Sequence, residues 1–295
     1  MKELELVSIK QMPIRKVNGF TSSPVSDILS VEEPLEIRIA YGTKTARVQK
    51  NMSVTMRTPG NDLELAVGFL FTEGIISSYD HVKAVHHAGM NCSSQKENIV
   101  QVELAESFAP DLMQSERNFY TTSSCGVCGK GSIQSIRTVS PFCHLEKPAL
   151  TLSADVLYTL PQKLKDAQNG FAATGGIHAS GLFTMEGNLV LSREDVGRHN
   201  ALDKLVGSAL TNYLLPLNQH ILLLSGRASF ELIQKAAMAG ISIVAAIGAP
   251  SSLAVDLAEE FDMTLLGFLN ESRFNIYSLS ERILIPAINE NQNKS

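Results

Sequence analysis

The 295-residue sequence contains no tryptophan, only four cysteines and no excess of basic residues. Its formal net charge of −5 gives no global positive field that would attract nucleic acid or anionic lipid. The first ten residues, MKELELVSIK, include acidic side chains and no continuous apolar region, unlike a secretory signal. The most apolar stretch, residues 240–255, is interrupted by glycine, proline and serine and cannot span a bilayer. We therefore expect a cytoplasmic protein without nucleic-acid or membrane partners.

Length and composition favour a folded protein of two domains. Apolar residues make up 44% of the sequence and charged residues 19%, which is typical of a globular chain with a sizeable core. We expect an N-terminal α+β domain over residues 1–120 and an α/β domain over residues 121–290. Residues 291–295, at the C-terminus, are expected to be a disordered tail.

The first of these domains contains both strand and helix patterns. Residues 35–42, 46–58 and 97–106 have the composition of strands. Residues 58–74 indicate a helix with one apolar face, in which Thr58 is a candidate N-cap and Gly74 suits the position after the last turn.

The second domain begins with a helix, a hairpin and another helix. Residues 153–170 indicate a helix capped by Ser153, and Pro161 is expected to kink or shorten it. Residues 180–192 indicate a hairpin, and residues 194–214 a helix with an apolar side.

The clearest architecture lies between residues 220 and 269. Three strand patterns alternate with two helical patterns: 220–227, 229–240, 241–248, 249–261 and 263–269. A β-α-β-α-β series implies a parallel sheet with right-handed crossovers. Ligands of such sheets bind beyond the carboxyl ends of the strands. The segments at those ends are SGR (225–227), GAPSS (248–252) and FLNESR (268–273).

Two of the four cysteines form a Cys-x-x-Cys pair, Cys125 and Cys128, in the glycine-rich loop 121–132. In a reducing compartment such a pair is more often catalytic or metal-binding than a structural disulfide. A structural zinc site needs four ligands. The other two could come from Cys92, Cys143, His144 and His178, but none of these forms a second closely spaced cysteine pair, so zinc is not the favoured interpretation. A thioredoxin-type redox pair needs a firm helix start, for which this loop has too much glycine. The alternative to any chemical role is that Cys125 and Cys128 are two unrelated loop cysteines.

Sulfur transfer is a third chemical interpretation of the pair. A thiolate can take the terminal sulfur of a donor persulfide, which requires an accessible cysteine with a lowered pKa. Glycines would let the loop visit donor and acceptor in turn, and Lys130 and Arg137 could favour the thiolate. The second cysteine could then attack the inner sulfur and help to release the cargo.

Several motifs, in order along the chain, resemble one known family. They are TSSCGVCGKGS, FAATGGIHASGLF, REDVGRHNALDKL, LLLSGRASFELIQKAAMAGI, GAPSSLAVDLAEEFDMTLLGF and RFNIY. Together they are similar to the FdhD family of formate dehydrogenase accessory sulfur carriers, over most of the chain from about Ile37 onward. The ordered set is far more specific than the Cys-x-x-Cys pair alone.

The resemblance implies a function, partners and a fold. Proteins of this family look like sulfurtransferases that take sulfur from a cysteine desulfurase as a cysteine persulfide. They pass it to the molybdenum cofactor, bis-molybdopterin guanine dinucleotide, before its insertion into the catalytic subunit of formate dehydrogenase. The implied fold is a cytidine-deaminase-like three-layer α/β/α domain with an added N-terminal domain, and the implied assembly is a homodimer. Cys125 matches the carrier position, and Cys128 would assist it.

The likeness to deaminases does not extend to their chemistry. Zinc deaminases need an H-x-E motif followed by P-C-x-x-C. Here Ser180 stands where the glutamate would be, and the cysteine pair precedes His178 and lacks the proline. The sequence therefore excludes zinc deamination at this site.

The cofactor is expected at the carboxyl edge of the parallel strands. The segment that matches the family's cofactor-contacting stretch consists of Phe268, Leu269, Asn270, Glu271, Ser272 and Arg273. Asn270 and Glu271 replace the extra basic residue common in relatives, which places more weight on Arg273. Arg227 is the second cation at this edge, Ser251 a candidate phosphate ligand or simple helix cap, and His178 a candidate pocket residue or structural histidine. GDP, as the guanine half of the cofactor, is the expected mimic.

A dense charged segment, residues 193–204, admits two interpretations. Solvated or ion-paired surface charge with Asp195 as an N-cap is one, and a functional site is the other. The run from Gly197 to Asn200 is costly for a helix, which favours the second. For the whole protein, a cofactor-binding chaperone without sulfur transfer, or a zinc or disulfide protein, are the alternatives to the sulfur carrier.

Overall fold

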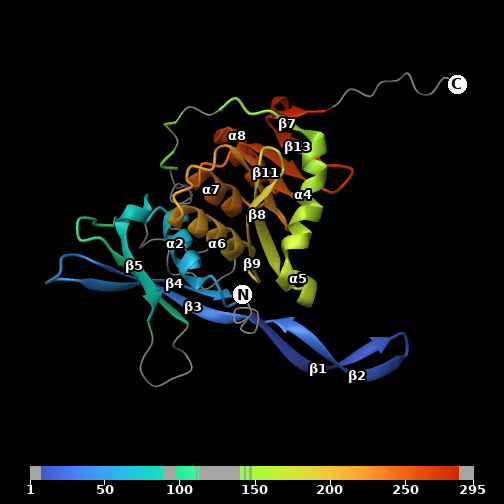
Figure 1. Ribbon diagram of the computed structural model, residues 1–295, viewed down its shortest axis with the longest axis horizontal. Helices are drawn as coiled ribbons and strands as arrows, with labels where there is room; N and C mark the ends of the chain where they lie inside the picture. The colour runs from blue at the N-terminus through green and yellow to red at the C-terminus, as the bar shows by residue number, and fades with distance from the viewer. Residues whose placement is uncertain are drawn as a thin grey trace.

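The structure is a computed structural model that describes residues 8–88, 98–110, 112, 140–142, 144–145 and 148–285. The elements of the first half are β1 (Ile9–Asn18), β2 (Thr21–Ser30), β3 (Glu33–Tyr41), β4 (Val48–Arg57), α2 (Asp62–Thr72), η1 (Tyr79–His81), β5 (Val82–His87) and β6 (Ile99–Leu104). Strands β4, β3, β6 and β5 form a four-stranded sheet in that order, and β1 pairs with β2 as a separate hairpin (Figure 1). The strands predicted over 35–42, 46–58 and 97–106 are confirmed as β3, β4 and β6, whereas no pattern predicted the hairpin.

The second half is built around a six-stranded sheet. Its elements are β7 (Leu152–Ser153), α4 (Ala154–Ala167), α5 (Asn169–Thr174), β8 (His178–Thr184), β9 (Leu189–Asp195), α6 (Arg198–Thr211), β10 (His220–Leu224), α7 (Phe230–Met238), β11 (Ile243–Ala246), α8 (Ser252–Glu260), β12 (Thr264–Gly267), β13 (Asn275–Ser278), η3 (Ser280–Arg282) and β14 (Ile283–Leu284). The strand order is β13-β12-β11-β10-β8-β9. Strands β10, β11 and β12 are parallel, and the β8–β9 hairpin is antiparallel, as predicted.

Alternation along the strands separates two cores, one on each face of this sheet. Ile221 and Leu223 of β10 pack on one face with Leu157 and Leu160 of α4. Leu222 and Leu224 point to the other face, where α6, α7 and α8 supply the partners. Helices thus cover both faces of the sheet, and the predicted α/β class is confirmed (Figure 1). The more specific likeness to cytidine deaminases stays a prediction.

Helix α2 joins the first half of the chain to the second by crossing α6. A Cβ atom on Gly68 would lie 1.9 Å from the carbonyl oxygen of Asp203, and one on Gly207 would lie 1.9 Å from that of Glu64. Only glycine allows the two backbones to approach so closely. The core on this side consequently runs without a break from β3 and α2 to α6 and β10. The predicted domain boundary at residue 120 and the predicted tail lie outside the described residues.

The predicted N-cap of the first helix was wrong, and so was the predicted shortening of α4 at Pro161, whereas a kink there stays a prediction. Helix α2 begins at Asp62 after Asn61, which has a φ of 56°, so Thr58 is not its N-cap. The backbone N–H of Thr58 donates to Asp195 Oδ2, and its hydroxyl accepts from the N–H of Val196, so tertiary partners outcompete the local cap. Pro161 does not shorten α4, which continues to Ala167 and is capped by Ser153 as predicted.

Among the described residues, no helix combines the length and apolarity of a membrane span.

Candidate functional site

The three segments predicted to meet at the carboxyl edge of the parallel strands do lie side by side. The N–H of Gly248 donates to the carbonyl of Gly226 at 3.0 Å, and the N–H of Phe268 donates to that of Gly248 at 3.1 Å. A Cβ on Gly248 would lie 2.9 Å from the backbone nitrogen of Arg227, so the close approach requires glycine there. Backbone hydrogen bonds therefore tie the loops after β10, β11 and β12 into one rim.

The loop 268–273 is organised by Asn270. Its side-chain oxygen accepts hydrogen bonds from the N–H of Ser272, the hydroxyl of Ser272 and the N–H of Arg273, all within 3.1 Å. Phe268 has a φ of 55° and is exposed, whereas Leu269 is buried in the core. The asparagine that departs from the family pattern thus shapes the turn. It leaves the side chains of Glu271 and Arg273 exposed.

A cavity of about 560 Å³ opens at this edge, between the rim and helices α4 and α5. It brings together two of the predicted residues, His178 and Glu271. Its other polar and aromatic lining includes Lys165, Gln168, Phe171 and Ser225. The α4 and α5 residues were missed, because an amphipathic helix pattern does not tell which exposed side chain borders a neighbouring loop.

The remaining predicted rim residues lie beside this cavity rather than in its lining. Arg227 is exposed at the end of β10, and neither it nor Arg273 has an ion pair within the part of the chain that the structure describes. The hydroxyl of Ser251 accepts from the N–H of Ala254 at 3.3 Å, so this serine caps α8. The N-termini of α7 and α8 both face the edge, where unpaired backbone N–H groups favour anions.

Two histidines at the edge are held neutral by their surroundings. Burial lowers the pKa of His178, the charges of Arg198 and Arg227 lower it further, and Asp195 opposes them. Burial is also the main reason that the pKa of His199 falls to about 3, with Lys235 and Arg198 adding to the effect. Both imidazoles are therefore uncharged near neutral pH and can accept or donate a hydrogen bond without adding charge.

The charged segment 193–204 is largely internal and ion-paired, so the prediction of ion-paired charge is confirmed and that of solvated surface charge was wrong. Asp195 and Lys204 are buried and form an ion pair of 2.7 Å. The Asp195 carboxylate also accepts from the N–H of Thr58 and of Gly197, and the N-cap position of α6 belongs to Gly197 rather than to Asp195. Lys204 donates to the carbonyl of Thr58 at 2.8 Å. This segment holds the β4–α2 connection against β9 and α6.

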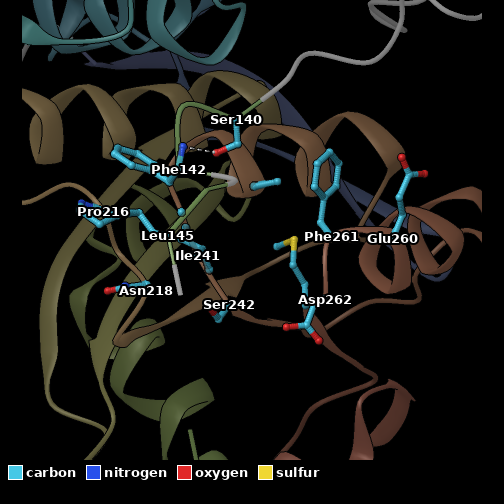
Figure 2. Close-up of a pocket in the computed structure, with 13 residues that line it drawn as sticks. Ser140, Phe142, Leu145, Pro216, Asn218, Ile241, Ser242, Glu260, Phe261 and Asp262 are labelled. Carbon is cyan, nitrogen blue, oxygen red and sulfur yellow. Dashed lines mark hydrogen bonds between the residues drawn. The ribbon is translucent and has the colours of Figure 1, made fainter. Parts of the chain in front are cut away.

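A second cavity, of about 300 Å³, lies at the opposite, amino edge of the parallel strands (Figure 2). Phe142, Ile241 and Phe261 make much of its lining apolar, and Asp262 lies at its border. The N–H of Phe142 donates to the hydroxyl of Ser140 at 3.2 Å. Ser140 is the residue at which the described chain resumes after residues 113–139.

Cys125 and Cys128 lie outside the described residues, as do Cys92 and Cys143. Among the residues that are described, no group of three or more His, Cys, Asp or Glu side chains is arranged to hold a metal ion. The site that the described residues form is therefore the cavity at the carboxyl edge of the parallel strands together with its rim, called the crevice below.

The fold and the site define a class of protein. It is an α/β protein with a crevice that suits anions at the carboxyl edge of its parallel strands. The chain matches the FdhD/NarQ family over residues 30–284, and it belongs to that family. It is 49% identical over 260 residues to a sulfur carrier protein FdhD of Mycolicibacterium paratuberculosis, covering 87% of this chain and 92% of the relative. The corresponding protein of Streptomyces avermitilis is 48% identical over 92% of this chain and 96% of its own.

More distant relatives agree with this assignment. A sulfur carrier protein FdhD of Sulfurisphaera tokodaii is 40% identical over 94% of this chain and all of its own length. A crystal structure of a formate dehydrogenase accessory protein from Desulfotalea psychrophila superimposes with a TM-score of 0.69, covering 94% of this chain and 99% of that one. Its sequence identity is 20%, so it supports the fold alone.

Proposed function

We propose that this protein is a sulfur carrier that serves a formate dehydrogenase. In this proposal it accepts sulfur from a cysteine desulfurase on Cys125 and delivers it to the molybdenum cofactor, bis-molybdopterin guanine dinucleotide. The observation that carries the proposal is membership of the FdhD/NarQ family together with the Cys-x-x-Cys pair in TSSCGVCGKGS. A cytoplasmic homodimer and a cytidine-deaminase-like fold complete what the resemblance implies.

The loading step needs only an accessible thiolate. The Cys125 thiolate attacks the terminal sulfur of the desulfurase persulfide, the S–S bond of the donor breaks, and the donor cysteine leaves as a thiolate. The product is a persulfide on Cys125, with no net oxidation. For release, the Cys128 thiolate attacks the inner sulfur, hydrosulfide leaves, and the two cysteines become a disulfide that a thiol reductant must reopen.

The crevice at the carboxyl edge suits the guanine dinucleotide end of the cofactor. Lys165, Arg227 and Arg273 supply positive charge for phosphate, and the N-termini of α7 and α8 add backbone donors. The Glu271 carboxylate borders the cavity and can accept from the N–H groups of a guanine. When bound, the cofactor supplies the molybdenum that takes up the sulfur.

Chain length permits Cys125 to serve this crevice. Cys125 follows Leu112 by 13 residues, and an extended chain of that length spans at most about 45 Å. The parallel strands, four or five residues long, are only about 13 to 17 Å from edge to edge. A segment of this length is therefore long enough to span the sheet from one edge to the other.

Intact mass after incubation with a cysteine desulfurase and cysteine tests the proposal. We expect a gain of one sulfur atom that a thiol reductant removes, absent in Cys125→Ala and retained in the control Cys92→Ala. Activation of the client formate dehydrogenase should fall with Cys125→Ala in parallel. A Cys125→Ala protein that activates its client normally would overturn sulfur transfer and leave a cofactor-binding chaperone. Bound zinc in place of a mass gain would instead identify a metal protein.

A further inference from the structure

The first turns of α6 and α7 meet at the carboxyl edge of the six-stranded sheet. Strands β9 and β10 are both antiparallel to β8, so they run in the same direction and end at the same edge. Helix α6 follows β9, helix α7 follows β10, and both pack on the same face of the sheet (Figure 1). His199 Nε2, in the first turn of α6, lies 3.4 Å from the hydroxyl oxygen of Ser229, the N-cap residue of α7. The N-termini of the two helices therefore converge.

Neither helix is capped by the side chain of its N-cap residue. That residue is Gly197 in α6, and in α7 the hydroxyl of Ser229 makes no capping hydrogen bond. Glu231 Oε2 lies 3.9 Å from the same ring nitrogen of His199 that Ser229 faces, which favours the tautomer with its hydrogen on Nε2. The oxygen of Ser229 then accepts from His199, and its own hydrogen remains available to a ligand together with the first N–H groups of α7.

The contacts of His199 exclude a hydrolytic triad. In a serine–histidine–acid triad the serine and the acid contact opposite nitrogens of the imidazole. Here Ser229 and Glu231 both face Nε2. The cluster therefore supplies hydrogen-bond donors and not an activated nucleophile.

Arg198, the first residue of α6, brings a positive charge to this point. It is half-buried, and its Nε is closed off from solvent without a hydrogen-bond partner in the part of the chain that the structure describes. Burial is the main cause of the lowered pKa of both His178 and His199, and the charge of Arg198 adds to it in each case. The guanidinium therefore lies close to both rings.

Neighbouring carboxylates do not neutralise this guanidinium. Asp195 pairs with Lys204 at 2.7 Å. Asp203 pairs with Lys235 at 3.0 Å. Glu231 lies beside the imidazole on α6, and no described carboxylate forms an ion pair with the guanidinium. A positively charged group that is half-buried without a partner is unfavourable, and an anionic ligand would supply that partner.

His178 connects this cluster to the cavity at the same edge. Its ring forms part of the cavity lining, and a Cβ on Gly226 would lie 3.3 Å from it, so the ring packs on the turn that leads to α7. Ser180 follows two residues along β8 and points to the same face of the sheet, the face that α6 covers. Ser180 is 1% exposed, and its hydroxyl has no hydrogen-bond partner within the described ranges. A second polar group on the α6 side of the strand thus lacks a partner.

The donors at this point suit a tetrahedral oxyanion. A guanidinium presents its N–H groups as a planar fork that matches phosphate, and the first turn of a helix adds backbone N–H groups and a favourable dipole. Neutral imidazoles can donate further hydrogen bonds without a charge of their own. Because these donors come from α6, α7 and β8, they approach from different directions, and a ligand with four oxygens offers an acceptor to each.

We propose that Arg198, Ser229 and the first turn of α7 bind a tetrahedral oxyanion, with His178 and His199 at its sides. The site lies where α6 and α7 meet, whereas the cavity proposed for the guanine dinucleotide is bordered by α4 and α5. The oxyanion is either free in solution, as phosphate or sulfate is, or it is the phosphate of a nucleotide that reaches across from the cavity. The second source rests on the proposed function, and the first does not.

Titration calorimetry of the full chain with inorganic phosphate, at fixed ionic strength, tests the site. We expect the wild type to bind phosphate and Arg198→Ala to bind it about 10- to 150-fold more weakly, because a charged hydrogen bond is lost. Arg198→Lys should recover only part of the affinity, since lysine keeps the charge without the fork. Ser229→Ala should weaken binding by about 2- to 10-fold. Arg15→Ala, which removes one positive charge from the exposed β1–β2 hairpin, should retain the wild-type affinity.

GDP and guanosine distinguish the two sources of the oxyanion. If a nucleotide phosphate occupies the site, inorganic phosphate should compete with GDP, and Arg198→Ala should weaken the binding of GDP but not that of guanosine. If the ligand is a free oxyanion, phosphate should bind equally well to protein saturated with GDP, and Arg198→Ala should leave the affinity for GDP unchanged. Sulfur loading of Cys125, measured by intact mass, reports on the proposed function separately.

Three results would overturn the oxyanion site. They are a wild type that does not bind phosphate, equal phosphate affinities of wild type and Arg198→Ala, and an equal loss in Arg15→Ala, which would show an effect of overall charge alone. Circular dichroism and the unfolding midpoint of each variant separate lost binding from lost folding. If Arg198→Ala does not fold, Arg198→Lys and Ser229→Ala decide the question, and wild-type phosphate affinity in both would reject the site.

Discussion

The ammonium of Lys204 lies 2.7 Å from Oδ2 of Asp195, and both side chains are sealed from solvent. Lys204 sits on α6 and Asp195 at the end of β9, and both bond to the backbone of Thr58. The pair therefore fixes the connection between β4 and α2 on the second half of the molecule. A buried ion pair of this kind is costly to break from one side, since the charge that remains has no partner.

Removal of the lysine charge should destabilise the fold. Lys204→Met leaves the Asp195 carboxylate buried without its counter-charge, and we expect a loss of about 3–5 kcal/mol in the free energy of unfolding. Urea titration at fixed pH measures the change. The exposed Lys44→Met should shift stability by less than about 0.5 kcal/mol. A Lys204→Met protein as stable as that control would show that the pair does not carry the connection.

The crossing of α2 and α6 should not tolerate a side chain at its closest point. Gly207→Ala places a Cβ 1.9 Å from the carbonyl oxygen of Glu64, so the helices must separate. We expect a loss of about 1–3 kcal/mol or more, measured by thermal and urea unfolding. At Gly176 a Cβ would meet only the Thr174 carbonyl at 3.9 Å, which makes Gly176→Ala the matched control. Equal stabilities of the two variants would contradict the close crossing.

The crevice should bind GDP, and Arg273 should contribute to the affinity. Loss of a charged hydrogen bond to phosphate costs roughly 2–3 kcal/mol, so Arg273→Ala should weaken binding by about 30- to 150-fold. Calorimetry at fixed salt is the measurement, with Arg15→Ala of the β1–β2 hairpin as the control for loss of one positive charge. Equal affinities of wild type and Arg273→Ala would remove Arg273 from the site. No binding to the wild type would remove the crevice as a guanine nucleotide site.

Stability should fall on acidification in part through His199. Its pKa is lowered from 6.5 to about 3 by burial and by nearby positive charges. Between these pH values the unfolded chain binds a proton that the folded protein does not. The contribution of His199 is therefore fully present above pH 6.5 and is lost as the pH falls toward 3. The shift of His178 acts in the same direction.

The matched test of this pH dependence uses two histidine variants. Urea unfolding between pH 7 and pH 4 should show a shallower loss of stability in His199→Asn than in the wild type. The exposed His87→Asn should retain the wild-type slope. Identical slopes of stability against pH in all three proteins would show that the folded protein does not keep His199 unprotonated.

The sequence by itself predicted the elements whose signals are local. Runs such as HILLL and IVAA are too short and too apolar for exposed helices, and their alternation with amphipathic helices implied the parallel order of β10, β11 and β12. Because parallel strands end at one edge, the placement of residues 225–227, 248–252 and 268–273 followed from the same pattern. The family could also be recognised, since it depends on ordered motifs rather than on contacts.

Only the tertiary structure decided where partners far apart in the sequence meet. The sequence does not distinguish a solvated Asp195 or Lys204 from a buried one. Their burial depends on Thr58 and α2, which lie more than 120 residues away in the sequence. The prediction that Thr58 caps a helix was wrong because Thr58 bonds to those same distant partners instead. The contribution of α4 and α5 to the cavity likewise depends on packing. The periodicity of a sequence indicates which side of a helix or strand is apolar, but it does not identify the element that packs against that side.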